Sequence, residues 1–167
     1  MKSLYIIRHA KSSWGNIDLQ DYDRPLNDRG KNDAPDMARR LLNRGTKIDA
    51  FVTSPAKRAK KTAEYFTQIF GVKENKIILV DDLYHASENT FYAIVAELDN
   101  ELKHVALFSH NPGITDFANS LCVGVKTDNM PTCSIFAVSA DIKKWKDFRD
   151  AEKSFLFFDY PKKTGVK

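Results

Sequence analysis

The sequence predicts an α/β fold: a three-layer sandwich in which a mostly parallel central sheet has helices on both faces. Short apolar runs at residues 4–7, 48–53 and 105–108 have the length expected of buried strands. Segments in which apolar residues recur at helical spacing lie between these runs, so strands and helices alternate along the chain. With 167 residues, the chain is expected to form a single domain, residues 1–167.

The first strand, at residues 4–7, is followed by a polar loop at residues 11–24. Asn27 is the expected N-cap of the first helix, and Gly45 is its expected stop. Pro35 lies inside this helix and is expected to kink or delay it, because proline has no N–H to donate and its ring crowds the preceding turn.

The second helix has a strong start signal. Ser54 is its expected N-cap and Pro55 its first helical residue, and both residue types are favoured at these positions. Gly71 is expected to end this helix. A short strand at residues 77–80 and a third helix at residues 90–102 are expected next.

The last part of the chain repeats the pattern. The strand at residues 105–108 precedes Asn111 and Pro112, the expected N-cap and first-turn residue of a fourth helix. Two late strands are expected at residues 135–138 and 155–158.

Composition and charge narrow the classes of function. Hydrophobic residues make up 43% of the chain and charged residues 29%, as in ordinary globular proteins. No apolar stretch approaches the ~20 residues of a membrane helix, and the N-terminal apolar run is broken at Arg8. We therefore expect no membrane association, no signal peptide and a cytoplasmic location.

The net charge of +4 suits anionic partners, but the basic residues are scattered along the chain. This distribution favours a solvated surface with a few cations at an anion site over a nucleic-acid interface. The two cysteines, Cys122 and Cys133, form neither a disulfide framework nor a metal-binding pattern and are expected to be buried free thiols.

Residues suited to phosphate chemistry follow three of the expected strands. Arg8 and His9 follow the first, Ser54 to Arg58 the second, and His110 the strand at residues 105–108. Ligands of open parallel sheets bind beyond the carboxyl ends of the strands. These residues, about 50 apart in sequence, are therefore expected at one edge of the sheet.

The residue types fit phosphoryl transfer. Arg8 and Arg58 supply planar forks that match phosphate oxygens, and the helix start near Arg58 adds N–H groups and a partial positive charge. Next to two arginines, His9 should be neutral and thus able to attack phosphorus. His110 should be protonated once phosphate is bound and stabilise charge in the transferring group.

Each of these residues has an ordinary alternative when taken alone. His9 or His110 would then be a hydrogen-bonded structural histidine, and Arg58 a solvated helix cation. A metal site is disfavoured because His104 and His110 lie at opposite ends of one expected strand, and Arg8 would repel a cation beside His9. Joint placement at three strand ends favours the phosphate site.

Other phosphate chemistries lack their residues. A cysteine phosphatase needs an arginine six residues after its cysteine, where this chain has Asp128 and Ser139. No glycine-rich loop ending in lysine and serine or threonine is present for nucleotide phosphates. The carboxylates of Asp21 and Asp23 follow no apolar strand, so this segment is interpreted as part of the loop.

With these residues at its three strand ends, the chain resembles the histidine phosphatase superfamily, which includes the phosphoglycerate mutases. It is most similar to the short branch typified by the SixA-type phosphohistidine phosphatases. The resemblance spans most of the chain in the family's order, and its fold would be phosphoglycerate mutase-like. The matching motifs are LYIIRHAKS at 4–12, RPLNDRG at 24–30, SPAKRAKKTA at 54–63 and SHNPG at 109–113.

The resemblance implies that His9 is the residue phosphorylated. It implies that Arg8, Arg58 and His110 bind the phosphoryl group, without a metal or other cofactor. Further substrate-binding residues are expected at the cavity edge, namely Arg24, His85 and Asn111.

The chain departs from the wider superfamily at two places. Ala10 replaces the glycine usual after the arginine–histidine pair, a change associated with the short branch. Larger members carry a proton-donating acid in a segment inserted after the third strand, and here residues 82–89 leave little room for one. His85 and Glu88 are the candidate donors, and the third alternative is that none exists.

A site without a firm acid suits a substrate whose leaving group departs readily, such as the imidazole of phosphohistidine. The expected function is hydrolysis of such a phosphoryl group, for example from a phosphohistidine-bearing protein, by a monomeric enzyme. The alternatives are a small-molecule phosphomonoesterase, a mutase of the same superfamily and a non-catalytic phosphoprotein-binding module. A mutase is disfavoured because return transfer needs a lid that retains the intermediate.

Overall fold

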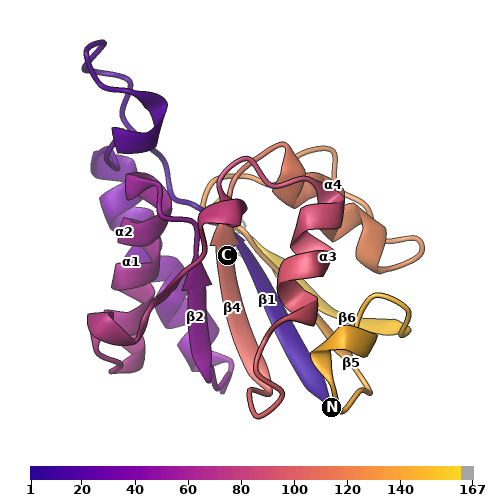
Figure 1. Ribbon diagram of the computed structural model, residues 1–167. Helices are drawn as coiled ribbons and strands as arrows, with labels where there is room; N and C mark the ends of the chain where they lie inside the picture. The colour runs from indigo at the N-terminus through magenta and orange to yellow at the C-terminus, as the bar shows by residue number, and fades with distance from the viewer. Residues whose placement is uncertain (163–167) are drawn as a thin grey trace.

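The computed structural model describes residues 1–162, and residues 163–167 lie outside the described part of the chain. Its centre is a six-stranded sheet in the order β3-β2-β4-β1-β5-β6 (Figure 1). The pairs β2–β3, β2–β4 and β1–β4 are parallel, whereas β5 is antiparallel to both β1 and β6. The predicted mostly parallel sheet is confirmed. The strands are β1 (Lys2–Arg8), β2 (Ala50–Thr53), β3 (Ile78–Leu79), β4 (His104–Ser109), β5 (Ile135–Ala140) and β6 (Lys153–Asp159).

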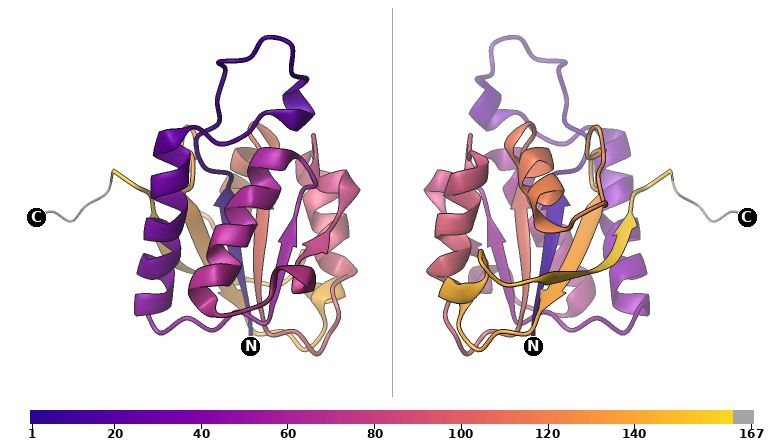
Figure 2. Two further views of the ribbon diagram at one scale, coloured as in Figure 1. Left: turned by 90° about the vertical axis from the view of Figure 1, so that its left-hand side faces the viewer. Right: turned by 90° about the vertical axis from the view of Figure 1, so that its right-hand side faces the viewer.

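Helices cover both faces of this sheet, as predicted (Figures 1 and 2). One face carries α1 (Asp28–Asn43) and α2 (Lys57–Phe70), and the other carries α3 (Glu88–Ala96) and α4 (Gly113–Leu121). Within residues 1–162, every helix is too short or too polar to cross a lipid bilayer.

The period-two alternation of β1 divides the core between the two faces. Leu4 and Ile6 join the apolar cluster under α3 and α4, whereas Tyr5 and Ile7 join the cluster under α1 and α2. Because both faces of β1 are buried, its central residues 4–7 are all apolar rather than alternating with polar ones. This is the pattern that predicted a buried central strand.

The first helix begins where the sequence predicts. Asn27 caps it by accepting a hydrogen bond from the Gly30 N–H at 2.9 Å. The helix then runs without interruption through Pro35, so the expected delay of its start is wrong. The cap fixes its start at Asp28, which lies seven residues before the proline.

The second and fourth helices begin later than predicted. Ser54 does not cap α2, which begins at Lys57 with Ala56 in the cap position. Asn111 does not cap α4, which begins at Gly113 after Pro112. The Ser54 hydroxyl instead lies 2.7 Å from His110 Nε2, and Asn111 lines the cavity and bonds to the Thr115 side chain.

The third helix is shorter than predicted and ends at Ala96. The Asp99 carboxylate accepts a hydrogen bond from the Glu101 N–H at 2.9 Å, a local turn that competes with helix continuation. The other predicted strands and the αL end of α2 at Gly71 are observed.

The register of the sheet brings three strand ends to one edge. Arg8 at the end of β1 pairs with Ser109 at the end of β4, and Thr53 at the end of β2 pairs with Phe108. Close backbone approaches fix the segments above this edge. A Cβ on Gly113 would lie 1.8 Å from the Ala86 carbonyl oxygen, so only glycine fits there.

Candidate active site

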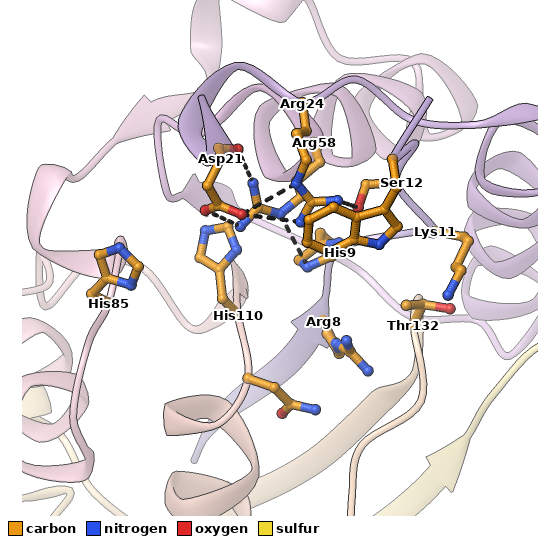
Figure 3. Close-up of a pocket in the computed structure, with 12 residues that line it drawn as sticks. Arg8, His9, Lys11, Ser12, Asp21, Arg24, Arg58, His85, His110 and Thr132 are labelled. Carbon is orange, nitrogen blue, oxygen red and sulfur yellow. Dashed lines mark hydrogen bonds and ion pairs between the residues drawn. The ribbon is translucent and has the colours of Figure 1, made fainter. Parts of the chain in front are cut away.

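A polar cavity of about 280 Å³ lies at the carboxyl edge of β1, β2 and β4 (Figure 3). It brings together the four predicted catalytic residues, which follow three different strands. The three further predicted residues also reach it. In full, the cavity is lined by Arg8, His9, Lys11, Ser12, Trp14, Asp21, Arg24, Arg58, His85, His110, Asn111 and Thr132.

The two candidate proton donors are placed differently. His85 lines the cavity, with its ring centroid 3.9 Å from that of Tyr84 and its backbone at φ 62°. Glu88 is half-buried at the start of α3 and lines a separate hollow with Asp116 and Lys126. The structure therefore brings His85 to the site and leaves Glu88 outside it.

The His9 imidazole is oriented by its own backbone turn. Its Nδ1 lies 2.7 Å from the Ala10 carbonyl oxygen, which can only accept a hydrogen bond. The proton is therefore on Nδ1, and the lone pair of Nε2 faces the cavity. There Nε2 accepts a hydrogen bond from Arg58 Nε at 3.3 Å. The ring thus presents a nucleophilic nitrogen beside a cationic donor.

Thr62 connects this turn to the helix that carries Arg58. Its hydroxyl accepts a hydrogen bond from the Ala10 N–H at 3.0 Å and donates one to the Arg58 carbonyl at 2.7 Å. The side chain is fully buried. Thr62 therefore holds the nucleophile and the arginine in register.

His110 is oriented by Ser54 rather than by a carboxylate. Its Nε2 lies 2.7 Å from the Ser54 hydroxyl, which also accepts a hydrogen bond from the Ala56 N–H at 3.2 Å. The His9 and His110 ring centroids are 5.1 Å apart. The serine that the sequence suggested as a helix cap is thus a positioning residue for the second imidazole.

Two buried polar atoms of the site have no partner among the described residues: Arg8 Nε and His110 Nδ1. Arg8 is anchored only through Nη1, which donates to the Met130 carbonyl at 2.8 Å. Buried donors are almost always satisfied in folded proteins, so unpaired donors at a cavity point to a ligand. A phosphoryl group supplies the acceptor oxygens that these atoms lack.

The electrostatics of the cavity favour an anion. Burial, then the charges of His110, Arg58 and Arg8, hold the pKa of His9 well below its usual range, while its bond to Ala10 opposes this. Burial and Arg58 also lower the pKa of His110, to about 3. Burial and Arg58 lower the pKa of Arg8 as well. Both imidazoles are therefore neutral, as expected for His9 from its proximity to Arg8 and Arg58.

Asp21 was missed by the sequence interpretation. It lies in a short 3-10 turn (Asp21–Asp23), and its carboxylate accepts from Arg58 Nη2 at 2.9 Å and from the Tyr84 hydroxyl at 2.7 Å. Arg24 donates to the other carboxylate oxygen from Nε at 3.2 Å and Nη2 at 3.1 Å. No local pattern places this residue at the site, because Arg58 and Tyr84, which hold it there, are 37 and 63 residues away in sequence.

The loop that carries Asp21 closes on itself and stands above the sheet edge (Figure 2). A bridge between Ser12 and Leu26 joins its two ends. Inside it, Arg24 donates from Nη1 to the Ser12 hydroxyl at 2.6 Å and lies 3.6 Å from the centre of the Trp14 ring. The predicted substrate-side arginine therefore lies in this loop.

Asn111 lines the cavity and joins α4 to the segment at 129–130. Its carbonyl oxygen accepts a hydrogen bond from the Thr115 hydroxyl at 2.5 Å, and its amide donates to Asn129. The segment that supplies Met130 to Arg8 is thereby fixed to the start of α4. Both predicted free thiols are confirmed as buried and unpaired. Neither lines the cavity, although the Cys133 backbone N–H donates to the His9 carbonyl at 3.0 Å.

Comparison with known proteins agrees with this geometry. The family model described as the histidine phosphatase superfamily (branch 1) matches residues 4–91. The chain belongs to the histidine phosphatase superfamily. This match includes Arg8, His9 and Arg58, whereas His110 lies beyond it.

A curated relative, an uncharacterized chloroplastic protein of Arabidopsis thaliana, is 27% identical over 124 residues, or 74% of this chain. The match covers 53% of that protein, so the chain spans about half the length of the curated relative.

Solved structures show the same SixA-type fold. The protein histidine phosphatase SixA complexed with tungstate has a TM-score of 0.80 at 22% identity, covering 95% of this chain and 97% of that chain. A candidate phosphohistidine phosphatase SixA of Agrobacterium tumefaciens has a TM-score of 0.79 at 23% identity, covering 96% and 98%. At these identities the similarity establishes the fold alone.

Proposed function

We propose that the protein is a phosphatase that works through a phosphohistidine intermediate on His9. The observation that carries this proposal is the bond from His9 Nδ1 to the Ala10 carbonyl, because it places the proton on Nδ1 and leaves Nε2 unprotonated in the cavity. In the first step, Nε2 attacks phosphorus while the bond to the leaving group breaks. In the second step, water attacks phosphorus, the P–N bond breaks, and phosphate and neutral His9 are released.

Arg58, Arg8 and His110 would hold the phosphoryl oxygens during both steps. Arg58 already donates to the attacking nitrogen, so a phosphoryl group on Nε2 would meet its guanidinium directly. The unpaired Nε of Arg8 supplies a second donor. A bound dianion would raise the pKa of His110 and allow this imidazole to carry a proton toward the transferring group.

Phosphohistidine proteins, or another labile phosphoryl compound, are the proposed substrates. Among the described residues that line the cavity, Asp21 alone carries a carboxyl group. Hydrogen bonds from Tyr84 and Arg58 outweigh the effect of burial and keep the pKa of this carboxyl well below its usual range, so it is ionised. An alkoxide must be protonated as it leaves, whereas imidazole departs readily. His85 remains a candidate donor, and the cellular compartment and oligomeric state stay predictions.

The test is a labelling experiment with the full chain. Wild-type protein is mixed with a ³²P-phosphohistidine protein or with ³²P-labelled small phosphate esters and quenched in alkali. We expect labelled enzyme and released phosphate, with faster turnover of the phosphohistidine protein. His9→Ala should abolish both signals, and His104→Ala, at the opposite end of β4, serves as the matched control.

Three results would overturn the proposal. Release of phosphate without labelled enzyme would exclude the covalent intermediate. Faster turnover of small esters would favour a phosphomonoesterase. Stoichiometric binding without release would indicate a phosphoprotein-binding module.

A further inference from the structure

We propose that Asp21 determines specificity by selecting substrates whose phosphoryl group is bonded to a protonated, positively charged nitrogen group, over phosphate esters. This inference rests on the proposed phosphatase function and names the substrate class of the same cavity. The class comprises N-phosphoryl compounds, of which phosphohistidine is one.

The Asp21 carboxylate is held at the cavity by donors on three segments. Arg58 of α2, Arg24 of the loop and Tyr84 each donate to it at 3.2 Å or less. Arg58 also donates from Nη1 to the Asp21 backbone carbonyl at 2.6 Å. A carboxylate held this way has a fixed position relative to His9, because the same guanidinium contacts both residues.

Burial places the carboxylate on the outer side of that guanidinium. The side chain of Asp21 is 43% exposed, whereas that of Arg58 is 5% exposed. His9, on the inner side, is also 5% exposed as a residue. Asp21 is therefore nearer to solvent than the buried nucleophile, and Figure 3 shows its side chain beside Arg58.

In an in-line displacement, the leaving group departs on the side opposite the nucleophile. Attack by the buried Nε2 of His9 therefore directs the leaving group toward the open side of the cavity. Asp21 lines that cavity and supplies its negative charge where the leaving group emerges. The charge of the leaving atom then decides whether the carboxylate helps or hinders.

A protonated N-phosphoryl imidazole carries a positive charge that Asp21 attracts. When Nε2 of His9 bonds to phosphorus, the P–N electron pair moves to the departing nitrogen. The group leaves as neutral imidazole, with the proton already on its other ring nitrogen. Asp21 favours the protonated form that reacts, and it loses its attraction once the neutral product forms.

An ester leaving group reverses the sign of the interaction. The departing oxygen gains negative charge, which the carboxylate repels, and an ionised Asp21 has no proton to supply. Esters are therefore disfavoured twice at this position, by charge and by the missing acid. The same residue thus favours one class and rejects the other.

Asp21→Asn tests this inference, with kcat/KM measured for a phosphohistidine peptide and for phenyl phosphate. We expect the ratio of the two values to fall by about tenfold, because two charges a few ångströms apart interact appreciably even near solvent. Asp23→Asn is the matched control: it removes the same charge from the same turn, but Asp23 lies outside the cavity lining. Its ratio should stay within about twofold of wild type.

Tyr84→Phe is a second variant that removes one donor to Asp21 and keeps its charge. Its ratio should also stay within about twofold, even if its overall rate falls. Added salt should lower the wild-type ratio and leave the Asp21→Asn ratio unchanged, because salt screens exposed charges.

An equal loss on both substrates in Asp21→Asn would overturn the inference and make Asp21 a positioning residue for Arg58. An unchanged or increased ratio would also overturn it. Failure of the proposed function is a separate result, since wild-type protein would then form no labelled His9 with either substrate.

Discussion

The cavity has two regions, a floor of residues that directly follow strands and a mouth that belongs to one long loop. Arg8, His9 and His110 form the floor, and each is attached to the end of β1 or β4. The mouth is the loop at residues 11–24, which includes Asp21 and is joined at its base by one bridge. The backbone of the floor is fixed by the sheet, whereas the mouth is fixed by side chains. We infer that the floor sets the reaction and the mouth sets the substrate.

Arg58 connects the two regions, and its removal gives the largest expected effect. It donates to His9 in the floor and to Asp21 in the mouth. We expect Arg58→Ala to lower kcat/KM by about 10³-fold, since one preorganised donor to a transition-state oxyanion contributes 10²–10³ and this side chain offers several. Steady-state kinetics with a phosphohistidine peptide measures the loss.

Arg24→Ala is the comparison, because Arg24 contacts Asp21 and Ser12 but not His9. Its loss should be about tenfold, as expected when a charge contact is removed near the edge of a site. Equal losses for the two variants would contradict the division into floor and mouth. Arg58→Lys should not restore activity, because lysine lacks the planar fork.

The difference between the regions also explains what could be predicted from the sequence. Arg8, His9 and His110 follow apolar runs, so a local pattern and the geometry of parallel sheets are enough to bring them together. Asp21 gave no such signal. Ser54 also follows an apolar run, but its role in orienting His110 was not predicted. Ser54 has the residue type of a helix cap, and only the tertiary structure turns it toward His110.

One long-range loop path and one local turn account for the remaining errors. Asp21 reaches the site because a loop folds back over the sheet edge, and no periodicity encodes that path. The third helix was predicted too long because the apolar spacing continues past Ala96, while the local bond of Asp99 ends the helix. Helix and strand existence was therefore predicted better than boundaries and loop paths.

A glycine-to-alanine substitution should change the free energy of unfolding more in the floor than in the mouth. Gly113 begins α4 in the segment behind the floor, where a Cβ would lie 1.8 Å from the Ala86 carbonyl oxygen. We expect Gly113→Ala to lower the free energy of unfolding by about 3 kcal/mol, because backbone must shift to admit the methyl group. Urea denaturation measures this change.

Gly15 in the mouth is the matched control, since the nearest atom to its Cβ position is the Ser13 hydroxyl at 3.3 Å, on a side chain that can rotate. Gly15→Ala should change the free energy of unfolding by less than about 0.5 kcal/mol. A loss of several kcal/mol in Gly15→Ala would show that the mouth is as tightly packed as the floor.

Groups in the floor and in the mouth should change the free energy of unfolding over different ranges of pH. The pKa values of His9 and His110 are lowered in the folded protein, so the unfolded chain binds more protons below its histidine pKa of about 6.5. Stability is therefore complete above pH 6.5 and falls as the pH decreases, by up to about 1.4 kcal/mol per pH unit for each histidine.

Asp21 in the mouth titrates in a lower window. Its folded pKa is also depressed, so it adds stability above its unfolded pKa of about 3.9 and loses this only in stronger acid. Urea denaturation between pH 7 and pH 5 should thus report the floor alone. His110→Asn should remove about half of the slope, and an unchanged slope would show that this imidazole is not held neutral in the fold.

Trp14 gives the smallest expected effect and tests the outermost part of the mouth. Its ring is 72% exposed, and the Arg24 guanidinium lies 3.6 Å from its centre. An exposed cation–π contact contributes about 0.5–1 kcal/mol. Trp14→Ala should therefore raise KM for a phosphohistidine protein by about two- to fivefold, leaving kcat for phenyl phosphate unchanged.

Ile17 is 94% exposed in the same loop, so Ile17→Ala is the control and should change neither value. A tenfold fall in kcat for the small ester would place Trp14 with the floor, since only a residue that orients the reacting groups slows the chemical step on a substrate too small to reach the rim.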